Sequence, residues 1–268
     1  MEKIFELADV NFSYLGKFPA LNNISLAIDK GENVVILGAN GSGKSTLLHL
    51  LAGLIFPSKG SVAAFGRVIN RDVFDDESFR QYFRKRVVVL FQNSDVQLFS
   101  PTVEEELYFG PLQLEIKIEE AKKIIDSLSE MLDIKKLFNR SPYQLSVGEK
   151  KKVAIASILA ISPEVLLLDE PTAGLDPRTS RELIDLITQY HGQGKTIIAA
   201  THDLHFVSEV ADKIYILSEE KTIAASGTKD EILSNRDLLN SHNLVHIHSH
   251  MHKDNWHKHL HQHGDKVL

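Results

Sequence analysis

The segment Gly38-Ala39-Asn40-Gly41-Ser42-Gly43-Lys44-Ser45 decides the fold of this 268-residue chain. It matches the pattern G-x-x-x-x-G-K-[ST], in which glycines let successive backbone N–H groups turn toward phosphate oxygens. A short apolar run from Val34 to Leu37 precedes it, and leucines at helical spacing follow Ser45. This order of strand, glycine-rich turn and helix predicts a phosphate-binding loop, to which the helix N-terminus adds a positive dipole.

The sequence around this loop predicts an α/β protein. Apolar runs separated by turn signals predict antiparallel strands over residues 1–36 and a further hairpin arm over 60–69. Residues 102–162 are mostly helical in pattern, with an amphipathic stretch from Ile118 to Leu132. From Val165 onward strands alternate with helices, so we expect a parallel sheet with helices on its faces.

Composition restricts the class of protein. Hydrophobic residues make up 43% and charged residues 25% of the chain, as in a globular protein. The absence of cysteine excludes disulfides, thiolate metal sites and Cys nucleophiles. Its apolar runs are far shorter than the roughly 20 residues of a membrane-spanning helix. A net charge of −6 gives no overall electrostatic reason to expect nucleic-acid binding.

A second motif supplies carboxylates. The apolar run Val165 to Leu168 predicts a buried strand that ends at Asp169 and Glu170. We expect Asp169 and the hydroxyl of Ser45 to bind Mg²⁺, while Lys44 reaches the β and γ phosphates. Glu170 then lies next to the attacking water, where a general base contributes about 10²- to 10⁴-fold to the rate.

With four further motifs, the chain resembles the nucleotide-binding subunit of an ABC transporter over about residues 3–235. Leu145-Ser146-Val147-Gly148-Glu149 occupies the signature position, and Ala173-Gly174-Leu175-Asp176 resembles the D-loop. Gln92 is placed as the Q-loop glutamine and His202 as the switch histidine, while Tyr14 lies where the family stacks an aromatic ring on adenine. The resemblance implies a P-loop NTPase with a parallel RecA-like core sheet, an N-terminal antiparallel β subdomain and an inserted α-helical subdomain.

The resemblance also implies the cofactors and the site. ATP and Mg²⁺ are the expected ligands, and residues 1–240 form the ATPase domain, with the helical subdomain at about 95–162. The implied catalytic residues are Glu170, His202, Gln92 and Lys44, and the implied Mg²⁺ ligands are Ser45, Gln92 and Asp169. The implied nucleotide-binding residues are Tyr14, Gly38, Asn40, Gly41, Ser42, Gly43, Lys44, Ser45, Thr46, Ser146, Gly148, Glu149 and Asp176.

The signature motif explains why the family works in pairs. Ser146 and Gly148 precede a helix whose N-terminus can bind an anion, and in the family this motif closes over the γ-phosphate held by the opposite subunit. We expect a homodimer, or a heterodimer with a paralogous ATPase; a homodimer is sufficient, because this chain retains every catalytic motif. Val147 and Glu149 stand where the family usually has Gly and Gln, which leaves the detailed geometry of the pocket open.

The segment from Phe91 to Glu106, with Phe109-Gly110-Pro111 after it, resembles the energy-coupling-factor branch, especially its cobalt and nickel uptake ATPases. In that branch this segment lies beside the groove for the coupling helix of the transmembrane component. The resemblance implies a peripheral ATPase on the cytoplasmic face of the cell membrane. Its partners would be integral transmembrane and substrate-capture subunits, with no nucleic acid.

The end of the chain is rich in histidine. Nine of the 13 histidines follow residue 241, and we expect residues 241–268 to form a flexible metal-binding tail. Imidazole suits Ni²⁺ and Co²⁺, and alternating histidines in a flexible chain can converge on one ion. A solvated tail without a role is the alternative, whereas the interleaved residues argue against a purification tag. The candidate ligands are His246, His248, His250, His252, His257, His259, His261 and His263.

Several functions remain open at this point. The preferred hypothesis is the ATP-hydrolysing subunit of an importer for nickel or cobalt. A vitamin importer of the same branch is the nearest alternative, since the ATPase does not contact the substrate and only the tail indicates metal. A soluble ABC ATPase acting on nucleic acid or ribosomes, and a metal-storage protein, are alternatives of other classes.

Overall fold

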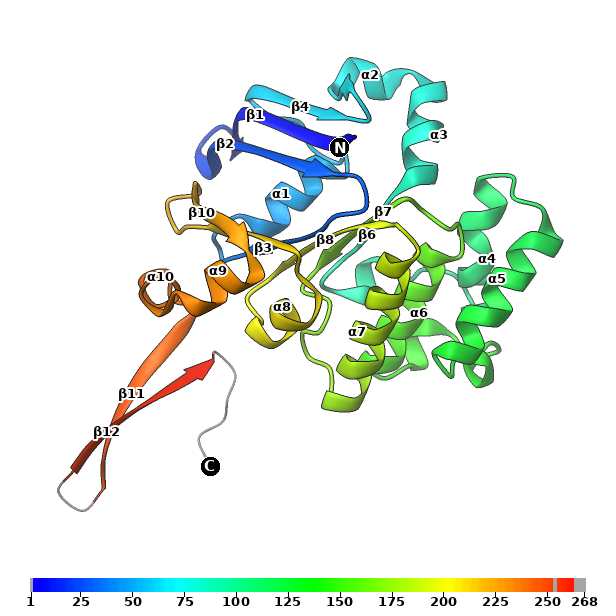
Figure 1. The fold of residues 1–268 in the computed structure, drawn as a ribbon. Coiled ribbons are helices and arrows are strands. Elements are labelled where there is room, and N and C mark those ends of the chain that lie inside the picture. Colours follow the sequence, from blue (N-terminus) through cyan, green and yellow to red (C-terminus); the bar gives the residue numbers. More distant parts are fainter. Residues whose placement is uncertain (1, 253–254, 263–268) are drawn as a thin grey trace.

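A six-stranded sheet forms the centre of the computed structural model, which describes residues 2–252 and 255–262 (Figure 1). Its order is β10-β9-β3-β8-β7-β6, and all neighbouring strands run parallel except the edge pair β10 and β9. Buried strands of a parallel sheet are apolar throughout, which is why these segments show continuous apolar runs. The strands are β3 (Asn33–Leu37), β6 (Val87–Leu90), β7 (Val165–Asp169), β8 (Thr196–Thr201), β9 (Lys213–Leu217) and β10 (Ile223–Thr228).

A four-stranded antiparallel sheet precedes and flanks this core. Its order is β2-β1-β4-β5, in which β1 (Lys3–Tyr14) pairs with both β2 (Phe18–Asp29) and β4 (Lys59–Ala64). The short β5 (Arg67–Val68) closes the edge next to β4. The strands expected before residue 37 and the hairpin arm at 60–69 are both present.

Helix α1 (Lys44–Leu51) lies between the two sheets (Figure 1). Its leucines pack with the inner face of the antiparallel sheet and with alternate residues of the central strands, such as Val34 and Ile36. Val35 and Leu37 point to the opposite face, because successive side chains of a strand alternate between faces. The central sheet is therefore covered on both sides. This packing fixes the position of β3 and of the loop that follows it at the carboxyl edge of the sheet.

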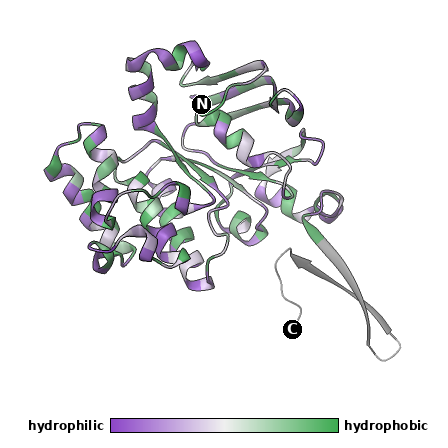
Figure 2. Cartoon of the chain, turned by 180° about the vertical axis from the view of Figure 1, so that it is seen from behind, coloured by the Kyte–Doolittle hydropathy of each residue, from purple (hydrophilic) through white to green (hydrophobic). Residues whose placement is uncertain are grey.

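The helices of the second face bury the other half of the core. Figure 2 shows hydrophobic residues concentrated on the central strands and on the inward sides of the surrounding helices. Among the described residues, no helix is both long and apolar enough to cross a membrane. Three helices lie on this face, α6 (Val147–Leu159), α7 (Pro177–Gly192) and α8 (Leu204–Val210), and α4 (Val103–Gln113) and α5 (Ile118–Met131) pack on α6.

Two helices were not expected from the sequence. Asn70 caps α2 (Arg71–Asp75) and Asp76 caps α3 (Glu77–Arg86), each accepting a hydrogen bond from a backbone N–H of its helix. α3 buries only Phe79 and Phe83 in an otherwise polar and basic sequence. Two apolar residues four positions apart are too weak a pattern to predict a helix, although the two caps offered a signal.

The C-terminal part differs from the expected flexible tail. After α9 (Lys229–Ser234) and α10 (Arg236–Ser241), Leu244 and Val245 are buried against the core, so the packed body extends past residue 240. Strands β11 (Val245–His252) and β12 (Asn255–Gln262) then pair as an antiparallel hairpin. The alternation of histidine with other residues has the period of a strand, which accounts for this difference.

Candidate functional site

The predicted catalytic groups follow neighbouring strands of the central sheet. The phosphate-binding loop follows β3, and His202 follows β8, the strand next to it. Glu170 follows β7, and Gln92 comes two residues after the end of β6. Because the carboxyl ends of parallel strands meet at one edge of a sheet, these groups come together although 164 positions separate Gly38 from His202 (202 − 38).

A hollow of about 440 Å³ opens at this edge. It is lined by residues of the loop, of α1, of the first two strands and of the segments after β6 and β7. Nine of the sequence-predicted residues line it: Tyr14, Asn40, Gly41, Gly43, Lys44, Ser45, Thr46, Gln92 and Glu170.

Two glycines of the loop are required by the backbone. A Cβ atom on Gly38 would lie 2.6 Å from both the Leu217 carbonyl oxygen and Ser42 Oγ. Gly43 has a φ of +109°, and a Cβ there would collide with the Ala20 carbonyl. Both positions therefore exclude side chains, and the loop keeps the tight course that lets its N–H groups surround a phosphate.

Lys44 crosses the loop to the carboxylate side. Its Nζ donates to the carbonyl oxygens of Gly38 at 2.8 Å and Ala39 at 3.1 Å, and it lies 3.4 Å from Glu170 Oε1. Burial lowers the pKa of Lys44, while the charges of Glu170 and Asp169 oppose that shift. The Lys44 ammonium can exchange its two carbonyl partners for phosphate oxygens, because a charge-assisted bond to a phosphate is stronger than a bond to a neutral carbonyl.

The residues present fit a magnesium ion. Asp169 is buried at the end of β7, and its Oδ1 has no hydrogen-bond partner among the described residues. Burial raises the pKa of this carboxyl, while a hydrogen bond with Ser45 lowers it. A buried carboxylate oxygen left free beside a hydroxyl is a donor set that Mg²⁺ prefers, and such an ion usually also takes phosphate oxygens of the substrate.

Glu170 is the centre of the hydrogen-bond network. Its backbone has a φ of +43°, a left-handed conformation that costs energy for a residue other than glycine and often marks a functional site. Its N–H donates to the Ala200 carbonyl at 2.9 Å, and Thr201 Oγ1 donates to its Oε2 at 2.9 Å. The neighbouring strand β8 therefore holds the carboxylate in place.

His202 completes this network. Its Nδ1 lies 2.9 Å from Glu170 Oε1, and that hydrogen bond raises the pKa of His202 above its ordinary value. Burial raises the pKa of Glu170, but the hydrogen bond of His202 and the charge of Lys44 outweigh it, so that the pKa is lowered. Glu170 is thus held as a carboxylate, the form that a general base requires.

The chain is similar in sequence to known proteins. The sequence profile of the ABC transporter family matches residues 21–173. The chain is 44% identical to the nickel import ATP-binding protein NikO of Rhodobacter capsulatus, over 91% of this chain and 97% of the relative. It is 42% identical to the energy-coupling factor transporter ATP-binding protein EcfA of Methanococcus maripaludis, over 90% and 85%.

The chain belongs to the ABC transporter family. Among solved structures, CbiO1 of Clostridium perfringens, described as part of the ABC transporter complex CbiONQ, superimposes with a TM-score of 0.76 at 33% identity. That superposition covers 91% of this chain and 96% of CbiO1. The expected P-loop α/β fold is therefore confirmed. The chain is an ABC ATP-binding subunit of the energy-coupling-factor, cobalt and nickel branch.

The signature residues of this ABC subunit do not line the hollow of about 440 Å³ in their own chain, which is called the nucleotide hollow below. Ser146 caps α6: its N–H donates to Glu149 Oε2 at 2.8 Å, and its Oγ accepts from the Glu149 N–H at 3.3 Å. Asp176 caps α7 without a reciprocal bond: its Oδ1 accepts from the N–H groups of Arg178 and Thr179, both at 3.0 Å, and its Oδ2 accepts from Thr179 Oγ1 at 2.6 Å. Gly148 packs against Thr179, so signature and D-loop lie side by side.

Tyr14 lines the hollow from the end of β1. Its hydroxyl is 3.2 Å from Thr46 Oγ1, and its ring meets Phe12 edge to face at 5.0 Å. The ring remains partly exposed, which leaves one side free to stack on a flat heterocycle. Its predicted nucleotide contact stays a prediction.

The ABC subunit ties its Q-loop to the signature helix through residues that the sequence did not single out. Lys151 on α6 is almost fully buried, and its Nζ donates to the carbonyl oxygens of Phe91 at 3.2 Å and Gln92 at 2.9 Å. Gln97 Nε2 donates to the Ala154 carbonyl at 3.1 Å, and Gln97 Oε1 accepts from the Phe91 N–H. Burial lowers the pKa of Lys151 to about 8.

Two other residues near the phosphate loop were also missed. Thr201 holds Glu170, as described above. Lys221 lines the hollow from the turn after β9, and its Nζ donates to the Gly41 carbonyl. Thr201 directly precedes the switch histidine, but its bond to Glu170 was not predicted, and no motif marks Lys221.

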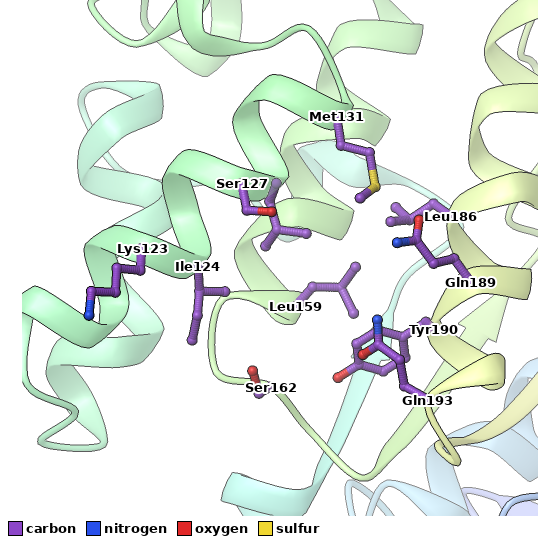
Figure 3. A pocket seen from close by; sticks show the side chains of 11 residues that line it. Lys123, Ile124, Ser127, Met131, Leu159, Ser162, Leu186, Gln189, Tyr190 and Gln193 are labelled. Carbon is purple, nitrogen blue, oxygen red and sulfur yellow. The ribbon is translucent and has the colours of Figure 1, made fainter.

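A second hollow, of about 330 Å³, lies between the helical part of the chain and the core (Figure 3). Side chains of α5, such as Met131, face side chains of α7, such as Gln189, across Leu159. None of the sequence-predicted site residues is among the described residues that line it, and these include no carboxylate. It does not offer the donor set of a magnesium–nucleotide site.

Proposed function

We propose that this chain hydrolyses ATP to drive import of a transition-metal ion, nickel or cobalt, through a membrane partner. The observation that carries the ATPase half of the proposal is the network around Glu170, which joins Lys44, Thr201 and His202 at the edge of the nucleotide hollow. Bound Mg²⁺ would be held by Asp169, Ser45 and Gln92, and it would neutralise charge on the phosphates.

The chain's own residues supply the remaining chemistry. The loop N–H groups and Lys44 bind the β and γ phosphates, and Tyr14 orients the base. Glu170 accepts a proton from the attacking water, and His202 positions that water and the γ-phosphate. Two chains would face each other, each closing its Ser146–Glu149 segment over the γ-phosphate of the other, as a homodimer or with a paralogous ATPase.

An exposed apolar surface supports docking to a membrane partner. Phe99 and Phe109 meet edge to face at 4.7 Å and border a hollow of about 550 Å³ that is lined mostly by α4. Leu112 on the same hollow is 52% exposed. A groove of this kind suits a short helix of a transmembrane subunit that lays an apolar face into it.

Membrane attachment can be tested with matched substitutions. Leu112→Asp places a charge in this groove, and Val68→Asp places one on the antiparallel sheet at nearly the same exposure, 51%. We expect the first variant to be lost from the membrane fraction of the native cell and the second to remain. Equal retention of both would place the docking surface elsewhere.

The choice of substrate rests on the relative named for nickel import and on the histidine-rich C-terminus. Uptake of labelled nickel and cobalt at trace concentration tests it, in cells that carry either the wild-type chain or Glu170→Gln. We expect uptake of one of the two metals to collapse in the variant at unchanged protein level. Unchanged uptake of both would refute metal import and favour a vitamin importer of the same branch.

A further inference from the structure

The register of the C-terminal hairpin places histidine positions opposite one another, which neither ATP hydrolysis nor the fold requires. β11 and β12 pair antiparallel over eight register positions. Three of these positions pair histidine with histidine: His246 with His261, His248 with His259, and His250 with His257. His263 lies outside the described residues.

The three pairs occupy alternate positions of each strand, and alternate residues of a strand belong to one face. His252 belongs to the same face by this rule. The intervening positions pair Ile247 with Leu260 and Met251 with Trp256. The register therefore divides the hairpin into a histidine face and a face with apolar pairs, whereas a flexible tail would give no such division.

Directly opposite residues in an antiparallel pair have Cβ atoms about 4.5–5.5 Å apart. Two imidazoles at that spacing can bind one ion, and adjacent pairs can supply four ligands. Imidazole is a borderline ligand that suits Ni²⁺, Co²⁺, Cu²⁺ and Zn²⁺ but not Mg²⁺ or Ca²⁺. An isolated two-stranded hairpin is marginally stable in water, so an ion that joins the strands would also stabilise their pairing.

We propose that the β11–β12 hairpin is a binding site for a divalent transition-metal ion, with cross-strand histidine pairs as its ligand unit. Binding fixes the two strands in register. A supply role beside a metal importer rests on the proposed function, but the binding itself depends only on the histidines of this hairpin.

Two matched double variants separate cross-strand binding from binding by neighbours within one strand. His246→Gln with His261→Gln removes one complete pair and leaves two adjacent pairs. His246→Gln with His259→Gln also removes one histidine from each strand, but it breaks two pairs and leaves only one. Both variants retain the same number of histidines and share one substitution.

Calorimetric titration of the full-length chain with Ni²⁺ alone gives the readout. We expect the first variant to bind within a few-fold of wild type and the second to bind about tenfold or more weakly, because it keeps a single two-ligand unit. Equal affinity of the two variants would overturn the cross-strand arrangement. Absence of Ni²⁺ binding by the wild-type chain would overturn the site itself.

Hydrogen exchange supplies a structural readout. With Ni²⁺, we expect slower amide exchange on both β11 and β12, and no such protection in the variant with one remaining pair. Protection of one strand alone would contradict the proposal. Normal Ni²⁺ binding together with unaffected metal uptake in Glu170→Gln cells would instead refute the proposed function and leave this site standing.

Discussion

The phosphate-binding edge and the signature helix of this chain are built in opposite ways. At the edge, Glu170 is bound by groups from distant parts of the chain: Lys44 from α1, and Thr201 and His202 from the end of β8. At the signature helix, the side chains of Ser146 and Glu149 accept hydrogen bonds from each other's backbone N–H groups, and Val147 is 63% exposed.

This difference indicates what each region needs in order to act. The network around Glu170 is held by hydrogen bonds within the chain. Removing one of its charges affects several partners, because electrostatic interactions are strong in the low dielectric of a buried site. The signature residues form an ordinary helix cap on an open surface, and their hydrogen bonds contribute about 1 kcal/mol of local stability. Under the proposed function, the signature region acquires a nucleotide ligand only when a second chain approaches it.

Replacing glutamate by glutamine should therefore affect ATP turnover very differently in the two regions, and this is the largest difference we expect. Glu170→Gln removes the general base and is expected to lower the ATP turnover number about 10²- to 10⁴-fold. Glu149→Gln keeps a side-chain acceptor for the Ser146 N–H, since glutamine also completes a capping box, and should change turnover by about threefold or less. Steady-state phosphate release measures both.

Nucleotide binding is the control for this comparison. Glu170→Gln should still bind ATP, because Lys44, Ser45 and the loop N–H groups are untouched. Loss of binding in this variant would mean that it had disturbed the fold. A loss of turnover in Glu149→Gln as large as that in Glu170→Gln would remove the contrast between the two regions.

Mixing two inactive chains asks whether the regions act in one chain or in two. Lys44→Ala damages the phosphate loop, and Ser146→Arg blocks the signature surface. If sites form between identical chains, half of the dimers in an equal mixture are mixed, and each holds one complete site of two. Turnover should then recover to about one quarter of the wild-type value.

Each variant alone is the control and should remain inactive. No recovery in a mixture whose chains exchange, followed by size-exclusion chromatography with one labelled chain, would show that both residues must belong to one chain or that the partner is a paralogue.

Much of the phosphate-binding edge could be predicted from the sequence, because its geometry is local. The glycines of the loop, and the carboxylates directly after an apolar strand, carry their chemistry in a few consecutive residues. The chain order of strands and helices also sufficed for the parallel sheet. Gln92 and His202 could be placed only through the family resemblance.

The rest depends on contacts between distant residues. Lys151 is one of three consecutive lysines, and nothing in the sequence shows that it alone is buried against the Phe91 and Gln92 carbonyls. Thr201 lies beside the switch histidine, but its bond to Glu170 becomes visible only in the folded chain, and Lys221 lies in no motif. The hairpin was not predicted either, although its histidines recur at alternate positions, a period of two that is typical of strands.

Lys151 connects the signature helix to the carbonyl groups of Phe91 and Gln92, and its contribution to stability can be tested. Lys151→Met removes the donor to two carbonyl groups and should lower the free energy of unfolding by about 1–3 kcal/mol, the cost of leaving buried acceptors unpaired. Lys150→Met breaks only a surface pair with Asp95 and should cost about 0–1 kcal/mol. Urea unfolding at constant pH measures both.

The stability difference between wild type and Lys151→Met should also change with pH. The folded pKa of Lys151 is about 8, below its ordinary value of 10.5, so between these values the unfolded chain binds more protons. Wild type should therefore gain stability relative to Lys151→Met as the pH rises from about 8 toward 10.5. A flat difference across this range would contradict burial of the charged amine.

The smallest expected effect concerns the titration of His202. Its hydrogen bond to Glu170 raises its pKa above 6.5, so the stabilisation from this pair is fully present below pH 6.5 and is lost as the pH rises through the raised value. Glu170, with a lowered pKa, remains ionised over that window. In Glu170→Gln the imidazole keeps its burial and the repulsion of Lys44, so we expect its pKa to fall.

NMR titration of the histidine ring carbons measures this shift, with His202→Gln used to assign the signal. The titration is recorded for wild type and for Glu170→Gln under the same conditions. If the His202 pKa were unchanged in Glu170→Gln, the carboxylate would not be what holds the proton on the imidazole. Glu170 and His202 would then interact less strongly than their hydrogen bond indicates. The phosphate-binding edge would differ less from the signature helix, whose residues form only a local cap.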